Sequence, residues 1–167
     1  MPFNIVLILF LLLSCSPAFA SFDRLLDAVS VESGVPKHIL KAVCTHESES
    51  YYKGKRQPWP WTLNVGGKGI WFKSRSAAVA YAELELLGGT NPVKLDVGMC
   101  QINWFWHGEK FNSINSLINP AANIRYAAKY LKNIKRGKSW KYAVGAYHSP
   151  SNKERAKAYA SAVLSSY

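Results

Sequence analysis

The chain has 167 residues and a mass of 18.6 kDa, which suits one domain and is too short for two full-sized ones. Hydrophobic residues make up 49% and charged residues 19% of the chain, and there are only three cysteines, so an intrinsically disordered chain and a disulfide-dense miniprotein are both excluded. The formal net charge of +11 at pH 7 predicts attraction to a polyanion or an anionic surface, without saying which one.

The first twenty residues are typical of a secretory signal peptide. Residues 1–20 carry no charged side chain, hold an apolar run at residues 5–13 and end in a small-x-small pattern at residues 18–20. We expect cleavage at the end of this segment, which leaves residues 21–167 as a mature chain exported to the bacterial periplasm. A lipoprotein anchored through Cys15 is the alternative. No apolar run reaches the roughly 18 residues of a membrane-spanning helix, so no transmembrane span is expected.

The mature sequence is predicted to be mainly helical. Helical spacing of apolar residues indicates helices over residues 21–34, 36–49, 74–87, 119–134, 139–147 and 151–164. The clearest start is Asn119-Pro120, since asparagine is favoured as the N-cap and proline in the first turn. The only β signal is a pair of short strands between Pro58 and Phe72, around a glycine turn. We therefore expect a mainly α (α+β) fold with one small β-hairpin.

The second predicted helix places one carboxyl group on its apolar face. Glu47 follows Val43 and Cys44 by four and three residues, whereas Glu49 falls on the opposite, polar side with Thr45. Partial removal from water favours the neutral form of a carboxyl group, which a general acid requires. The pattern predicts Glu47 as a catalytic acid. A buried glutamate satisfied by a local hydrogen bond is the alternative.

Metal and phosphate motifs are absent from the sequence. His46-Glu47 does not continue as a zinc-protease motif, because Ser50 stands where the second histidine would be. The glycine-rich residues 66–69 lack the spacing of a phosphate loop, so we expect no metal and no cofactor. A surface or capping role is expected for the other histidines: His38, His107 and His148.

Four segments of the chain follow one another in a recognisable order. They are Glu47-Ser48 at a helix end, Gly98-Met99-Cys100-Gln101-Ile102-Asn103, residues 121–131, and Ala146-Tyr147. Together they resemble the motifs of the soluble-lytic-transglycosylase-like (SLT) family over nearly all of the mature chain. Residues 58–64 and 147–150 look like those of the small exported members associated with secretion and conjugation machinery.

This resemblance implies a lysozyme-like fold and cleavage of the β-1,4 bond between N-acetylmuramic acid and N-acetylglucosamine in peptidoglycan. Glu47 matches the catalytic acid/base, and Ser48 matches a residue that supports it. Gln101 matches a residue lining the sugar groove, and Tyr147 matches the tyrosine that faces the catalytic carboxylate. Two positions depart from the pattern: Cys100 stands where the family usually has methionine, and His148 where many members have asparagine.

Further substrate contacts are expected from the hairpin and the Gln101 motif. We predict that the hairpin lines the groove, with Asn64 offering its amide to the sugar. We count Ser48 and Asn103 among the substrate-binding residues as well. Flat faces for sugar rings are available, beside equally plausible core roles, on Trp59, Trp61, Trp104 and Tyr147.

One acid is enough if the substrate supplies its own nucleophile. Ordinary glycoside hydrolases need two carboxylates flanking the bond, and Asp96 precedes a motif where no second catalytic acid is expected. In a lytic transglycosylase Glu47 protonates the leaving oxygen and then, as base, delivers the 6-hydroxyl to form a 1,6-anhydro ring. A hydrolytic muramidase of the same fold is the alternative.

Cys44 and Cys100 are predicted to form a disulfide, because two thiols in an exported protein are most simply paired. Cys44 lies three residues before Glu47 and Cys100 directly before Gln101, so one groove would bring both together. Two buried free thiols are the alternative.

Basic residues accumulate between Glu109 and Glu154, where no acidic residue occurs. A solvent-exposed helix face is the simplest explanation of this basic stretch, and a nucleic-acid-binding module is the alternative hypothesis. The signal peptide and Glu47 argue against nucleic acid as a partner. The expected partners are peptidoglycan strands and, through the resemblance, a secretion, conjugation or pilus assembly machine. A catalytically silent adaptor on such a machine is a third reading.

Overall fold

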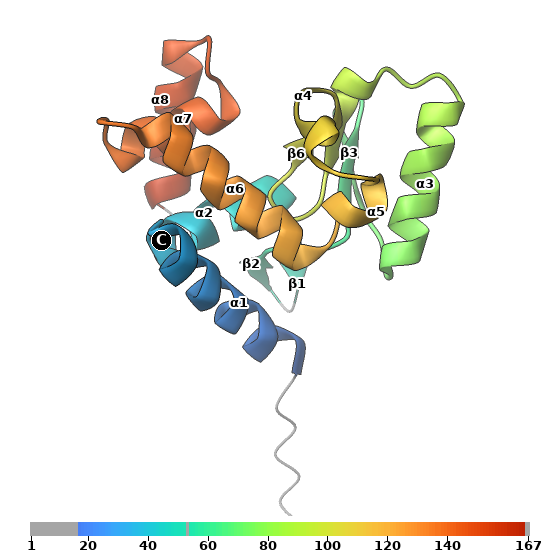
Figure 1. Ribbon diagram of the computed structural model, residues 1–167, viewed down its shortest axis with the longest axis horizontal. Helices are drawn as coiled ribbons and strands as arrows, with labels where there is room; N and C mark the ends of the chain where they lie inside the picture. Colours follow the sequence, from blue (N-terminus) through green and yellow to red (C-terminus); the bar gives the residue numbers. More distant parts are fainter. Residues whose placement is uncertain (1–16, 53, 166–167) are drawn as a thin grey trace, which may run out of the picture.

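The computed structural model describes residues 17–52 and 54–165 (Figure 1). Over these residues the helices are α1 (Pro17–Ser33), α2 (Lys37–Ser48), α3 (Arg75–Leu87), α4 (Trp104–His107), α5 (Ile114–Leu117), α6 (Pro120–Lys135), α7 (Trp140–His148) and α8 (Lys153–Ser165). The strands are β1 (Ser50–Tyr52), β2 (Lys55–Gln57), β3 (Thr62–Val65), β4 (Lys68–Trp71), β5 (Leu95–Val97) and β6 (Ile102–Asn103). Short 3-10 helices cover Pro92–Lys94 and Gly108–Lys110. Most of the predicted signal peptide, including Cys15, lies outside the described residues.

The mainly α fold with a small antiparallel sheet is confirmed, although the strands are more numerous than the sequence predicted. The predicted hairpin is β3–β4, and β5 and β6 extend it into a sheet of order β4-β3-β5-β6. A second hairpin pairs β1 with β2. The expectation of a single β signal was wrong because strands of two or three residues are too short to show an alternating pattern.

Helix α2 lies at the centre of the helical half of the molecule, in contact with α1, α6, α7 and α8 (Figure 1). Its side chains Leu40, Val43 and Cys44 are fully buried. Thr45 is buried too, which corrects its predicted place on a polar face. Because neighbours pack on more than one side of α2, its polar side is narrower than helical spacing alone suggests.

Close helix packing shapes the C-terminal part of the helical half. Helices α7 and α8 pack against each other beside α2 (Figure 1), and Gly145 lies at their contact. A Cβ atom at Gly145 would come within 2.5 Å of the Ala156 carbonyl oxygen, so only glycine permits this approach. Within the described part of the chain, no helix is both long and apolar enough to cross a membrane.

Candidate active site

A cleft of about 1020 Å³ runs past the C-terminal end of α2. The sheet side contributes residues of β3, β4, β5 and β6, and the helical side contributes residues of α2, α6, α7 and α8. The structure brings all six predicted catalytic and substrate-binding residues to this cleft: Glu47, Ser48, Asn64, Gln101, Asn103 and Tyr147.

Glu47 lies in the last turn of α2, in the wall of the cleft. The helix ends at Ser48 because Glu49 adopts a left-handed backbone conformation with φ of 43°, which turns the chain away from the helix axis. The Glu47 side chain is only 13% exposed, whereas Glu49 is exposed. The predicted inward direction of Glu47 is therefore confirmed, and Glu49 faces solvent as predicted although it lies just beyond the helix.

An aromatic cluster surrounds the Glu47 carboxyl group. Tyr159 of α8 donates its hydroxyl to Glu47 Oε1. The ring of His148 lies parallel to the Tyr159 ring with 4.5 Å between centroids. The ring of His46 meets the Tyr159 ring edge-on, with 5.1 Å between centroids. Burial, followed by the negative charge of Glu47, raises the pKa of Tyr159 well above its ordinary value, so the hydroxyl keeps the proton that it donates.

Sequence reasoning missed this cluster. Tyr159 lies 112 residues after Glu47, and its position beside the buried Ala160 and Val163 on α8 reads as an ordinary core residue. His148 lacked any motif partner and was expected at the surface or at a cap. The structure does place His148 at the exposed end of α7, and it also brings the ring Nδ1 to 3.8 Å from Glu47 Oε1, which the sequence did not predict.

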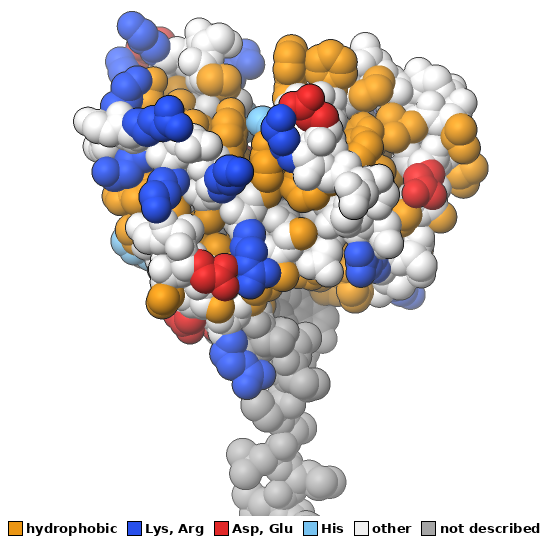
Figure 2. Space-filling model, viewed as in Figure 1, with side chains coloured by type: hydrophobic (Ala, Val, Ile, Leu, Met, Phe, Trp, Pro, Cys, Tyr) orange, Lys and Arg blue, Asp and Glu red, His pale blue; other side chains and the backbone are white. Residues whose placement is uncertain are grey.

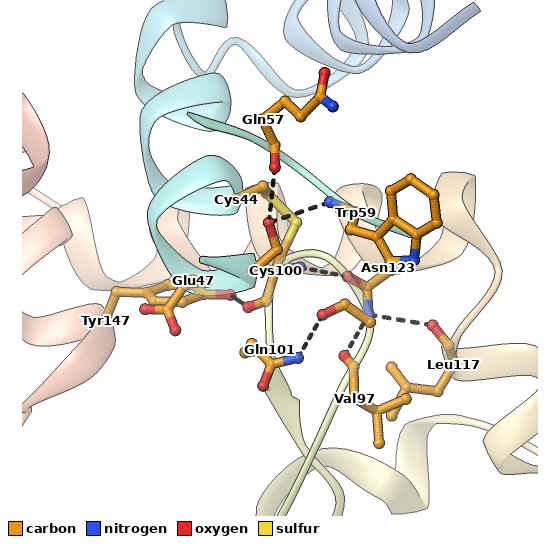
Figure 3. Close-up of a disulfide and its surroundings, with 12 residues drawn as sticks. Cys44, Glu47, Gln57, Trp59, Val97, Cys100, Gln101, Leu117, Asn123 and Tyr147 are labelled. Atoms are coloured by element: carbon orange, nitrogen blue, oxygen red, sulfur yellow. Dashed lines mark hydrogen bonds between the residues drawn. A yellow bond between two sulfur atoms is a disulfide. The ribbon is translucent and has the colours of Figure 1, made fainter. Parts of the chain in front are cut away.

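Tyr147 lines the cleft as predicted, but its hydroxyl does not bind the carboxylate. Figure 3 shows Tyr147 beside Glu47 with its hydroxyl donated to the carbonyl oxygen of Cys100, at 2.7 Å. Burial, then the negative charge of Glu47, raises the pKa of Tyr147 well above its usual range. Tyr147 therefore forms the wall beside the acid, while Tyr159 makes the hydrogen bond to it.

The predicted disulfide is present and joins α2 to the turn before β6. Cys44 and Cys100 are bonded at 2.04 Å with their Cα atoms 4.1 Å apart, and both are fully buried. The backbone of Cys100 is held as well, since its N–H donates to Asn123 Oδ1 at 2.9 Å and its carbonyl accepts from Tyr147 (Figure 3). The turn that carries Gln101 is thus fixed to three helices.

Asn123 of α6 holds this turn in place, a role that the sequence did not predict. It is fully buried on α6, and its Nδ2 donates to the carbonyl oxygens of Val97 and Leu117 at 2.9 and 3.2 Å. Gly98 has φ of 82°, and a Cβ atom there would come within 2.4 Å of the Asn123 side chain. Glycine is therefore required at position 98 both by the backbone conformation and by the lack of space.

Two amides of the predicted site stabilise the β5–β6 turn. Gln101 has a left-handed φ of 46°, and its Nε2 donates to the carbonyl oxygens of Gly98 and Thr62 at 2.7 and 3.3 Å. Asn103 donates from Nδ2 to Asp96 Oδ1 at 2.8 Å. Burial raises the pKa of Asp96. The hydrogen bond from Asn103 lowers this pKa, and the nearby negative charge of Glu47 raises it further. A second carboxyl group therefore shares the cleft with Glu47.

Ser48 is placed for a structural role. Its side chain is fully buried, donating to the Gln57 carbonyl oxygen at 3.3 Å and accepting from the Trp59 N–H at 3.1 Å. The predicted direct contact of Ser48 with substrate does not fit this placement, because its hydroxyl is already committed. Trp71 strengthens the same connection by donating from Nε1 to the Ser48 carbonyl oxygen at 2.7 Å. The end of α2 is thereby tied to the β3–β4 hairpin.

The aromatic residues on the cleft differ from those predicted. Trp71 and Trp106 line it, with 47% and 65% of their surface exposed. Trp61 and Trp104 pack against the core, and Trp59 donates from Nε1 to the Phe72 carbonyl oxygen. Of the predicted sugar platforms only Tyr147 lies on the cleft, because helical or strand spacing does not distinguish an exposed aromatic face from a packed one.

Asn64 is placed on β3 where it lines the cleft, and its Oδ1 accepts the Gly67 N–H at 2.9 Å in the hairpin turn. Asn64→Asp keeps this acceptor but removes the Nδ2 donor, whereas Asn64→Ala removes both. We expect both variants to lose about fivefold in activity on the expected peptidoglycan substrate, since one hydrogen bond to substrate is worth roughly 1 kcal/mol. Digestion assays and thermal melts check this. Full activity in Asn64→Asp would remove the amide from substrate binding.

The basic residues between positions 125 and 141 lie on α6, in the following turn and at the start of α7. Figure 2 shows Lys and Arg side chains gathered on the α6–α8 side of the molecule. Arg125 pairs with Glu32 at 2.8 Å, and Lys132 donates to the Ser33 carbonyl oxygen at 2.7 Å. Among the described residues, no group of three or more His, Cys, Asp or Glu side chains is placed to hold a metal ion.

Comparison with known proteins gives one match. Residues 25–165 match the family described as Transglycosylase SLT domain. Neither the curated proteins nor the solved structures gave a match. Because the matched segment contains α2 with Glu47 and every other residue of the cleft, the chain belongs to the Transglycosylase SLT domain family, which acts on peptidoglycan.

Proposed function

We propose that the protein is a lytic transglycosylase that cleaves the β-1,4 bond between N-acetylmuramic acid and N-acetylglucosamine and leaves a 1,6-anhydro-N-acetylmuramic acid end. The observation that carries this proposal is the position of Glu47, mostly buried at the end of a fixed helix yet open to a cleft of about 1020 Å³. Family membership supplies the substrate class. The cleft supplies an acid at the place where a glycan strand would lie.

The proposed reaction uses Glu47 twice. As acid, Glu47 gives its proton to the glycosidic oxygen, and the bond between that oxygen and C1 of the muramic acid breaks. The substrate's own N-acetyl group shields the developing positive charge at C1. As base, the Glu47 carboxylate then takes the proton of the 6-hydroxyl, whose oxygen forms the new bond to C1. No water is consumed, and Glu47 ends with the proton that it lent.

The surrounding residues support this double role. Tyr159 donates to Oε1 of Glu47 and so fixes the orientation of the carboxyl group. The disulfide and Asn123 hold the turn of Gln101 against α2, so that the sheet wall and the acid keep a constant distance. Such preorganisation lowers the cost of reaching the reactive geometry.

A hydrolytic muramidase is the second candidate, and one observation favours it. Asp96 lies in the same cleft as Glu47 and interacts with its charge. Two carboxyl groups flanking one bond are the usual machinery of a glycoside hydrolase. Asn103 holds the Asp96 carboxyl group at 2.8 Å, so this group has a fixed position in the sheet wall.

Asp96→Asn separates the two candidates. In the proposed transglycosylase Asp96 acts only through its charge, so the variant should be slower than wild type but far more active than Glu47→Gln, and its product should keep the anhydro end. In a two-carboxylate hydrolase the variant should lose activity as completely as Glu47→Gln. Product release from purified peptidoglycan by the three proteins is the measurement. Equal loss in both variants would contradict the one-acid mechanism.

We further propose that the protein works in the periplasm, beside a secretion, conjugation or pilus assembly machine. The uncharged apolar leader of residues 1–20 and the peptidoglycan substrate class support the compartment. Local opening of the cell wall is the chemistry that an assembly crossing the envelope needs. The basic side chains of α6 and α7 then face cell-envelope anions rather than nucleic acid.

A further inference from the structure

His148 is held beside Glu47 by two contacts. It is the last residue of α7, and its Nδ1 lies 3.8 Å from the same Glu47 oxygen that accepts the Tyr159 hydroxyl. The His148 and Tyr159 rings are parallel within 1°. The His148 side chain is 46% exposed. The imidazole is therefore fixed on one face by Tyr159, while solvent can exchange its proton.

The charged groups around His148 favour its protonated form. Glu47 comes from α2 and Asp96 from β5, while Arg155 is the opposing cation from α8. The nearby Glu47 carboxylate is the largest cause that raises the pKa of His148, and burial opposes it. The C-terminal end of a helix also favours a cation. Tyr159 stacks on the His148 ring, and His46 in turn meets the Tyr159 ring edge-on.

We propose that His148 is a positioning residue for Glu47: as an imidazolium cation it holds the Glu47 carboxylate against Tyr159. This inference rests on the proposed function, because it assigns His148 a part in the work of Glu47. An opposite charge about 4 Å from a carboxylate attracts it. The orientation of the Glu47 carboxylate therefore depends on the charge of His148 as well as on the Tyr159 hydrogen bond.

Three variants separate the charge of His148 from its ring. His148→Phe keeps a flat ring on Tyr159 without charge, His148→Lys keeps a cation without the aromatic ring, and His148→Asn keeps neither. Removing the cation removes the attraction that holds the Glu47 carboxylate in place. The value of kcat should therefore fall by about two- to fivefold for the Phe and Asn variants, and stay near the wild-type value for the Lys variant.

A merely structural role gives the opposite pattern. His148→Phe would then keep the wild-type kcat, and the Asn and Lys variants would both lose kcat. That outcome overturns the proposal. High salt should reduce the difference between wild type and His148→Phe, because the pair is partly exposed and its interaction is screened.

A titration without substrate tests the same coupling and does not depend on the enzyme activity. Histidine ring NMR signals are followed against pH in wild type and in Glu47→Gln, with His148→Asn used to assign the resonance. The midpoint of His148 should fall when Glu47 loses its charge. An unchanged midpoint overturns the inference even if the enzyme is an active transglycosylase. If the His148 midpoint falls in Glu47→Gln but the wild-type protein does not cleave peptidoglycan, the pairing of His148 with Glu47 is supported and the proposed function is contradicted.

Discussion

Glu47→Gln should abolish cleavage of peptidoglycan, with a rate loss of at least about 10² to 10⁴. Glutamine keeps the shape of the side chain and can still accept the Tyr159 hydrogen bond seen at Oε1. It cannot donate a proton to the glycosidic oxygen or recover one from the 6-hydroxyl. Turbidity loss of purified cell walls and release of soluble fragments measure the effect.

Glu49→Gln is the matched control for this variant. Glu49 lies two residues further along the chain and is exposed, so its replacement should leave most of the activity in place. Both variants should unfold close to the wild-type temperature, because neither creates a cavity. An active Glu47→Gln protein, or an inactive Glu49→Gln protein with a normal fold, would contradict the assignment of the acid.

Removing the disulfide should have the largest effect on stability. Cys44 and Cys100 are 56 residues apart in the chain, and a crosslink closing a loop of this length contributes about 4 kcal/mol to the free energy of unfolding through the unfolded state. The double variant Cys44→Ala, Cys100→Ala should therefore melt roughly 10 °C lower. Urea denaturation of the variant and of the oxidised wild type measures the difference.

The disulfide also bears on activity, because it joins the helix of Glu47 to the turn of Gln101. We expect the double variant to lose activity below its melting temperature, while the two hydrogen bonds of Cys100 with Asn123 and Tyr147 still hold part of the turn. Thiol labelling of the unfolded mature wild-type protein should find neither cysteine reactive. A variant as stable as the wild type would contradict the predicted contribution of the crosslink.

The sequence predicted what local patterns encode. The helix starting at Asn119-Pro120 is confirmed, with Asn119 Oδ1 accepting the N–H groups of the first turn. The direction of Glu47 followed from its spacing to Val43 and Cys44, because helix phase depends only on nearby residues. The β3–β4 hairpin was visible from its glycine turn for the same reason.

Contacts between elements that are distant in the chain could not be predicted from the sequence. Tyr159, His148 and Asn123 reach the site from α8, α7 and α6, and their partners lie far away in the chain. The buried state of the Ser48 hydroxyl depends on the segment of Gln57 and Trp59 that folds over it. A sequence motif can point to such residues. The contacts of each side chain depend on how the distant elements pack.

The chemical nature of the cleaved end tests the central claim most directly. Purified peptidoglycan is digested with the mature protein in ¹⁸O-labelled water, and the fragments are weighed by mass spectrometry. The account predicts 1,6-anhydro-N-acetylmuramic acid ends, because no water enters the reaction. These ends are lighter by one water than hydrolysed ends, about 18 Da in ordinary water and about 20 Da in ¹⁸O-labelled water. Reducing ends that carry the ¹⁸O label would contradict it and identify a hydrolytic muramidase.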